Sequence, residues 1–222
     1  DVVCVLGNGM VIDLDHLRHE ISVMQQMNVK ITPDNLKISD KATICMPMHV
    51  RQDVLEEERL SQTGSAYGST RRGIAYAYGD KYMKKTLRIG DILNIDQPSV
   101  RHRLQVIVES KNLILENVYK QDAISYNELL EWCKNQAQCF KDYICDTSKL
   151  LRDAAKNNKN ILFEAQLGAL RDIDYGIYPY TSSSNTLAAY IPMGTGLMGY
   201  NVSQVVGVMK AYSTCVGEGG FV

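Results

Sequence analysis

A short polar segment, residues 68–73, reads Gly-Ser-Thr-Arg-Arg-Gly. Its hydroxyl and guanidinium groups can donate hydrogen bonds to an anion, and its glycines allow backbone amides to approach a ligand closely. These residue types predict a site for a phosphate or carboxylate group. A solvated loop with two surface arginines is the competing interpretation, and composition alone favours it.

A second run of hydroxyl and amide side chains, residues 180–186, reads Tyr-Thr-Ser-Ser-Ser-Asn-Thr. Such a run can surround a phosphate. It can equally form turns in which the side chains bond to their own backbone, and composition favours this second interpretation.

The carboxylates of Asp172 and Asp174 could bind Mg²⁺, but we do not expect these two side chains to share one face at the end of a strand. We predict no metal site here. Gly7-Asn8-Gly9 lacks the third glycine of a dinucleotide fingerprint and the lysine of a P-loop, so it indicates a nucleotide turn only weakly. No residue is predicted to be catalytic from these patterns.

The histidines and cysteines show no spacing typical of a metal site. His49 and His102 are expected at helix ends or on the surface, with no nucleophile nearby. The six cysteines include no C-x-x-C pair, which indicates free thiols in a reducing compartment.

The overall composition excludes several classes of protein. A formal charge of -1 over 222 residues gives no summed field for nucleic acid or an anionic membrane. No apolar run approaches the roughly 18 residues of a membrane span. A cytoplasmic protein with no nucleic-acid or membrane partner is therefore expected.

The elements that must position these side chains alternate between strands and helices. The pattern predicts a strand at 2–6, a helix capped by Asp13 or Asp15, an apolar run at 43–46 and a helix over about 49–60. A long loop is expected over 61–79.

The second half of the chain continues this alternation. Ser125 and Glu128 predict a capping box at the start of a long helix. Further predicted elements are a helix at 146–156, a strand at 160–164 and a last helix from Ser203. Together the elements predict an α/β fold with a mainly parallel sheet and surrounding helices.

Several segments, in order, resemble motifs of the adenylosuccinate synthetase family. They are residues 6–9, 68–74, 77–81, 87–91, 163–164, 172–180, 183–186 and 210–219. This resemblance implies an incomplete, P-loop-NTPase-like adenylosuccinate synthetase fold, with residues 1–222 as the central part of the domain.

The resemblance implies a two-step ligase of purine (AMP) biosynthesis. GTP phosphorylates the 6-oxygen of IMP, and the amine of L-aspartate then displaces the phosphate to give adenylosuccinate, GDP and phosphate. Mg²⁺ would neutralise the transferring phosphoryl group. The main ligands of Mg²⁺ and GTP are expected outside residues 1–222, as are the family's catalytic residues, so the isolated chain is expected to be inactive.

The resemblance also assigns residues to IMP binding. The family's IMP-contacting threonine and its neighbouring arginine fall on Thr70 and Arg72. The arginine that the family donates across a homodimer to the partner's IMP falls on Lys84, which keeps the charge but loses the bidentate fork.

The remaining two assignments involve departures from the family pattern. The family's glutamine falls on Leu167, with Gln166 displaced by one position, and a later threonine falls on Ser182. The Gly-rich loop departs at three residues: Arg71, Ala75 and Tyr76. These departures leave open an alternative, a catalytically inactive nucleotide-binding or dimerisation module derived from the family.

Overall fold

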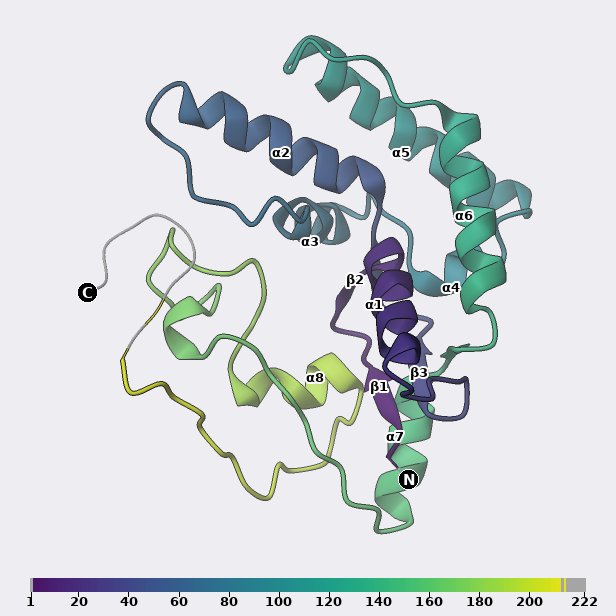
Figure 1. Cartoon of the computed structure of the whole chain (residues 1–222), viewed down its shortest axis with the longest axis vertical. Helices are drawn as coiled ribbons and strands as arrows, with labels where there is room; N and C mark the ends of the chain where they lie inside the picture. Colours follow the sequence, from purple (N-terminus) through teal and green to yellow (C-terminus); the bar gives the residue numbers. More distant parts are fainter. Residues whose placement is uncertain (1, 213, 215–222) are drawn as a thin grey trace.

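The structure, a computed structural model, describes residues 2–212 and 214 (Figure 1). The strands are β1 (Cys4–Leu6), β2 (Val11–Asp13), β3 (Leu36–Ser39), β4 (Thr43–Cys45) and β5 (Ile144–Cys145). The helices are α1 (Leu14–Gln26), α2 (Pro47–Ser61), α3 (Ile74–Met83), α4 (Ile89–Ile92), α5 (Pro98–Asn117), α6 (Tyr126–Phe140), α7 (Thr147–Lys156) and α8 (Ile191–Thr195). Short 3₁₀ turns span Ala169–Arg171 and Ala188–Tyr190.

The strands form two small parallel sheets, with orders β1-β3-β5 and β2-β4. Cys4 pairs with Leu36 in the first sheet, and Val11 pairs with Thr43 in the second. The predicted parallel pairing is confirmed, although it is divided between two sheets. The predicted first strand begins at Cys4, and the short strands β2, β3 and β5 were not predicted.

The core lies between these sheets and helices α4 to α6. It contains Ile38 and Ile44 from the strands, and Leu104 and Phe140 from the helices, all at most 2% exposed. The sequence interpretation did not include α5, although its buried residues follow helical spacing: Val100, Leu104, Ile107, Val108, Lys111 and Leu115.

Side-chain caps fix the starts of α1, α6 and α7, the last through Asp146, which accepts the N–H of Lys149 at 3.0 Å. Asp13 caps α1 by accepting the N–H of His16 at 3.0 Å, so the first of the two predicted candidates is the cap. Ser125 accepts the N–H of Glu128 at 3.3 Å and starts α6 as predicted. The predicted helices over 49–60 and 146–156 correspond to α2 and α7.

Three predictions along the chain are wrong. Residues 160–164 form no strand, because none of the described strands pairs with them, and Leu162 is 95% exposed. The described residues from Ser203 onward form no helix, and their apolar side chains are largely exposed. The expected loop over 61–79 ends at Gly73, because α3 begins at Ile74.

Figure 1 shows how the chain after α7 differs from the part before it. The segment drawn in green to yellow runs beside the purple strands with little regular structure apart from short helices such as α8. None of the helices in residues 2–212 is long and apolar enough to cross a membrane.

Candidate functional site

The polar loop of residues 68–73 joins α2 to α3, and α2 holds its backbone in place. Glu57 accepts the N–H groups of Gly68 and Ser69 at 2.6 and 3.1 Å. Asp53 accepts the hydroxyl of Ser69 at 2.7 Å and the N–H of Gly73 at 2.8 Å. Several of the amides that the sequence offered to a ligand therefore already bond to the protein itself.

The side chains of Thr70 and Arg72 lie on the outside of this loop and are exposed. The carbonyl of Arg72 accepts the thiol of Cys45 at 3.4 Å, which fixes the backbone behind the guanidinium group. The loop thus presents a hydroxyl and a guanidinium group to solvent from a tethered backbone, an arrangement suited to binding an anion.

Gly73 closes the loop against α2. Its φ of 74° lies in the left-handed region, and an added Cβ would come within 2.5 Å of the backbone nitrogen of Val50. Only glycine fits both the backbone conformation and this close approach.

The second polar segment brings Gln166 and Ser182 together through a third residue. The amide of Gln166 donates to the hydroxyl of Ser184 at 2.8 Å, and the hydroxyls of Ser182 and Ser184 lie 3.2 Å apart. Gln166 is exposed, while Ser182 is half-buried. Leu167, at the place of the family's glutamine, is 68% exposed with a φ of 65°.

Asp172 is the centre of this segment and is fully buried. Its Oδ1 accepts the N–H groups of Asp174 and Tyr175 at 3.0 and 3.1 Å, and its Oδ2 accepts that of Thr186 at 2.7 Å. Burial acts to raise the pKa of Asp172, but the backbone amides outweigh it and hold the pKa below its usual value. The carboxylate of Asp172 therefore holds together backbone groups that lie before and after Ser182 in the sequence.

Tyr78 connects α3 to the Gly7-Asn8-Gly9 turn near the start of the chain. Its hydroxyl donates to the carbonyl of Gly9 at 3.2 Å. Burial, together with nearby Tyr190, raises the pKa of Tyr78 to about 12. The Gly7-Asn8-Gly9 turn also contacts α8, where Gly9 donates its N–H to the carbonyl of Gly194 at 2.8 Å. The turn is therefore part of the framework around the polar segments.

Lys84 lies at the other end of α3 from the 68–73 loop. It is exposed and ends the helix with a φ of 62°. A helix of 10 residues is about 15 Å long, so Lys84 is well separated from Thr70 and Arg72. In residues 2–212, no hydrogen bond joins the side chain of Thr70 or Arg72 to Gln166 or Ser182. The five predicted residues therefore fall into two pairs, Thr70 with Arg72 and Gln166 with Ser182. Lys84 lies apart from the 68–73 loop.

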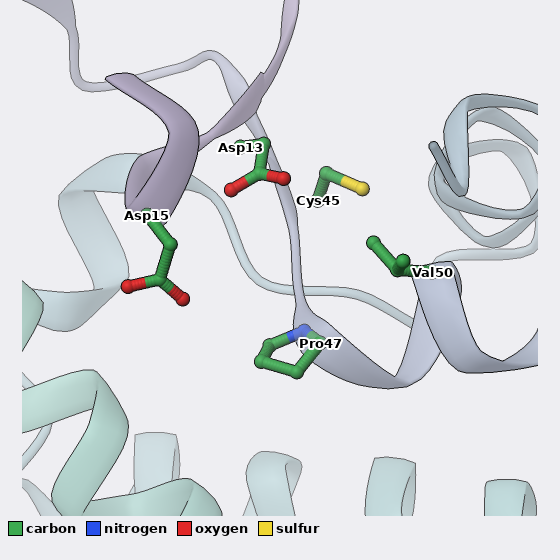
Figure 2. Close-up of a pocket in the computed structure, with 5 residues that line it drawn as sticks. All are labelled: Asp13, Asp15, Cys45, Pro47 and Val50. Carbon is green, nitrogen blue, oxygen red and sulfur yellow. The ribbon is translucent and has the colours of Figure 1, made fainter. Parts of the chain in front are cut away.

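A pocket of about 220 Å³ is lined by five residues: Asp13, Asp15, Cys45, Pro47 and Val50. Figure 2 shows the two carboxylates on one side of this pocket and Val50 on the other. Asp15 accepts Trp132 Nε1 at 2.7 Å, and Asp13 is the cap of α1. Burial and the nearby carboxylates raise the pKa of Cys45 to about 12, which makes it a poor nucleophile.

The two carboxylates that hold the loop, Asp53 and Glu57, were missed in the sequence. A signal was present, because His49, Asp53 and Glu57 are spaced four residues apart and share one face of a helix. All three are at most 6% exposed. His49 does lie at a helix end, as predicted, and His102 is exposed on α5.

Parallel strands, surrounding helices and two tethered polar loops define an α/β protein with a candidate anion-binding site. Comparison with known proteins gives the family. A sequence model of adenylosuccinate synthetase matches residues 1–222. The adenylosuccinate synthetase of Syntrophomonas wolfei is 41% identical over 221 residues, covering 100% of this chain and 50% of that protein.

Two further relatives agree. The adenylosuccinate synthetase of Caldicellulosiruptor saccharolyticus is 40% identical over 222 residues, covering 100% of this chain and 50% of that protein. The structure of fully ligated adenylosuccinate synthetase from Plasmodium falciparum matches with a TM-score of 0.86 and 30% identity, over 99% of this chain and 49% of that one. The chain belongs to the adenylosuccinate synthetase family, and it spans about half the length of the curated relatives it matches.

Proposed function

We propose that this chain is the central part of an adenylosuccinate synthetase, which ligates L-aspartate to IMP with GTP, and that it supplies part of the IMP site. The observation that carries the proposal is the 68–73 loop, which is tethered from behind while Thr70 and Arg72 face outward. The family membership supports the reaction, and purine biosynthesis supports a cytoplasmic location.

Each proposed residue has a binding role. The hydroxyl of Thr70 and the guanidinium group of Arg72 would donate hydrogen bonds to the phosphate of IMP, and the planar fork of arginine suits two phosphate oxygens at once. Gln166 and Ser182 would contact the same nucleotide from the second segment. These contacts would orient IMP so that its 6-oxygen can be phosphorylated, since an oxide is a poor leaving group until then.

The resemblance to the family implies Mg²⁺ as a cofactor and GTP as a co-substrate. In residues 2–212, no three His, Cys, Asp or Glu side chains group in a way that could hold a metal ion. The carboxylates nearest the loop, Asp53 and Glu57, already accept two hydrogen bonds each. These residues do not fit the metal, and we assign the chain to substrate binding.

Lys84 is proposed to act across a homodimer. It lies at the opposite end of α3 from the loop, and the neighbouring Tyr82 and Met83 are 69% and 58% exposed. Apolar side chains beside a cation are more favourable when buried against a second protomer than when exposed to solvent. A Lys84→Ala variant should weaken IMP binding in a dimeric sample, and sedimentation should show whether the dimer forms.

Calorimetry of IMP binding to the purified chain tests the proposal. A Thr70→Ala/Arg72→Ala variant should weaken binding at least about 100-fold, because it removes charge-assisted and neutral hydrogen bonds together. A Thr63→Ala/Arg59→Ala variant is the matched control and should bind as the parent does. Absence of saturable binding in a sample that circular dichroism shows to be folded would exclude the proposed IMP site.

A second candidate is a nucleotide-binding or dimerisation module without ligase activity. The observation that favours it is Leu167, an exposed apolar residue at the place of the family's glutamine. Gln166→Ala tests whether the neighbouring glutamine has kept the contact that Leu167 cannot make. A loss of IMP affinity means that the neighbouring glutamine has kept the contact, whereas unchanged affinity means that the contact is lost and favours the second candidate.

A further inference from the structure

The backbone of the 68–73 loop adopts a conformation that neighbouring groups must stabilise. Three of its six residues have positive φ angles: Gly68 at 68°, Arg71 at 57° and Gly73 at 74°. Arginine rarely adopts such an angle, so the conformation costs free energy unless surrounding groups fix it. Those surrounding groups determine where Thr70 and Arg72 point.

Glu57 is the first of them. A single oxygen, Oε1, accepts two consecutive backbone N–H groups, from Gly68 at 2.6 Å and Ser69 at 3.1 Å. The residue is 6% exposed, so water competes little for the carboxylate. Hydrogen bonds to a charged acceptor in such a place are stronger than neutral ones.

Asp53 is the second, one helical turn earlier on α2. Its Oδ1 accepts the hydroxyl of Ser69 at 2.7 Å, and its Oδ2 accepts the N–H of Gly73 at 2.8 Å. It is 5% exposed. Asp53 and Glu57 together hold both ends of the loop, on either side of Thr70 and Arg72.

We infer that Asp53 and Glu57 are positioning residues, which set the anion-binding conformation of Thr70 and Arg72 without touching the ligand. This inference rests on the proposed IMP site. It follows that the phosphate meets mainly side chains, because the amides of Gly68, Ser69 and Gly73 face α2. It also follows that the two carboxylates are not available as acids or bases for the reaction.

Hydrogen exchange of the whole chain, read by mass spectrometry, tests the tether without any ligand. Glu57→Ala and Asp53→Ala should each speed exchange in residues 68–73 by about 10-fold or more. Glu57→Gln keeps an oxygen acceptor and should stay within about 3-fold of the parent. Glu58→Ala is the matched control, because Glu58 is exposed on the same helix and should change nothing.

Calorimetry of the same variants with IMP tests the positioning. Glu57→Ala should weaken IMP binding at least about 10-fold while the circular dichroism spectrum and the α5–α6 exchange stay unchanged, and Glu57→Gln should restore most of the affinity. If the alanine variant weakened binding only through a general loss of stability, glutamine would not be expected to restore the IMP affinity. If the alanine variants fail to fold, Ser69→Ala removes the hydroxyl bond to Asp53 and takes their place.

The outcomes separate the two proposals. If the parent chain does not bind IMP, the proposed function fails, and the exchange experiment alone decides the tether. Exchange at parental rates in the alanine variants would overturn the inference. So would parental IMP affinity in variants whose loop exchanges faster, because the tether would then hold the loop without positioning the ligand groups.

Discussion

His49 donates the hydrogen on Nε2 to Oδ2 of Asp80 over 3.0 Å, and the two side chains are 0% and 3% exposed. The other ring nitrogen, Nδ1, accepts the N–H of Met46 at 2.9 Å, so the neutral ring carries its proton on Nε2. Lys111 places Nζ 2.8 Å from the same Oδ2 and 2.8 Å from Oε1 of Gln52. This cluster fastens α2, the helix that holds the loop, to α3 and α5.

The His49 ring should make stability depend on pH. Burial lowers the pKa of His49, and its bond to Asp80 offsets this only in part, with Lys111 adding to the decrease. Protonation would also place an N–H on Nδ1 against the N–H of Met46. Between the lowered folded pKa and the ordinary value near 6.5, the unfolded chain binds more protons, so stability rises with pH.

We therefore expect stability to be highest above about pH 6.5 and to fall as the pH is lowered through that window, by at most about 1.4 kcal/mol per pH unit. Urea unfolding between pH 7.5 and 5 measures this slope. His49→Gln should remove it, whereas His102→Gln, at an exposed position of α5, should keep it. Equal slopes for the parent and His49→Gln would contradict the assignment.

Removing the carboxylate of Asp80 should strongly destabilise the chain. Asp80→Ala leaves the ammonium group of Lys111, which is 6% exposed, without its charged partner, and such losses cost about 3–5 kcal/mol. Glu131→Ala, which breaks the exposed pair with Lys134, should cost at most about 1 kcal/mol. Denaturant midpoints measure both, and similar losses would argue against a buried charge cluster.

The sequence predicted the parts of the fold that depend on local patterns. Asp13 and Ser125 start helices where their side chains can cap the backbone, and the apolar spacing of α6 is regular. The predictions at 160–164 and after Ser203 failed because apolar content indicates burial only where a partner surface exists. In the described structure, Leu162 and Val208 are 95% and 97% exposed.

The exposed residues of the candidate site could be predicted from the sequence, whereas the buried carboxylates that hold the loop were not. Hydroxyl and guanidinium side chains such as Thr70 and Arg72 can be recognised from their types and from family motifs. Asp53 and Glu57 read as ordinary acidic residues of a helix, because their bonds to the loop join residues 11 to 20 positions apart. Their four-residue spacing with His49 puts them on one face of a helix, but only the fold shows that this face points inward.

Gly73 should tolerate substitution far less than another glycine with the same backbone angle. Gly64 has a φ of 68° and open space around it, whereas a Cβ on Gly73 would lie 2.5 Å from Val50 N. Gly64→Ala should cost about 1–2 kcal/mol from the backbone angle alone. Gly73→Ala should cost at least about 2 kcal/mol more, since α2 must move. Equal losses in urea unfolding would show that the close approach is absent.

Asp172 should control the order of the second polar segment. Its carboxylate gathers the amides of Asp174, Tyr175 and Thr186, which lie on the two sides of Ser182. Asp172→Ala removes all three acceptor contacts, so amide exchange over 168–186 should speed by about 10-fold or more. Exchange in α2 and α3 should stay as in the parent.

The matched control is Asp174→Ala, because this exposed carboxylate accepts only the side chain of Asn185, at 2.7 Å, among the described residues. Acid provides an independent check. The pKa of Asp172 is held low in the folded chain, so its contribution to stability is present above the ordinary value near 3.9 and is lost as the pH falls through the folded pKa. The parent should therefore lose protection of residues 168–186 at acidic pH, whereas Asp172→Ala should already lack that protection at neutral pH. Protection of this segment in Asp172→Ala at pH 7 would show that the carboxylate does not organise it.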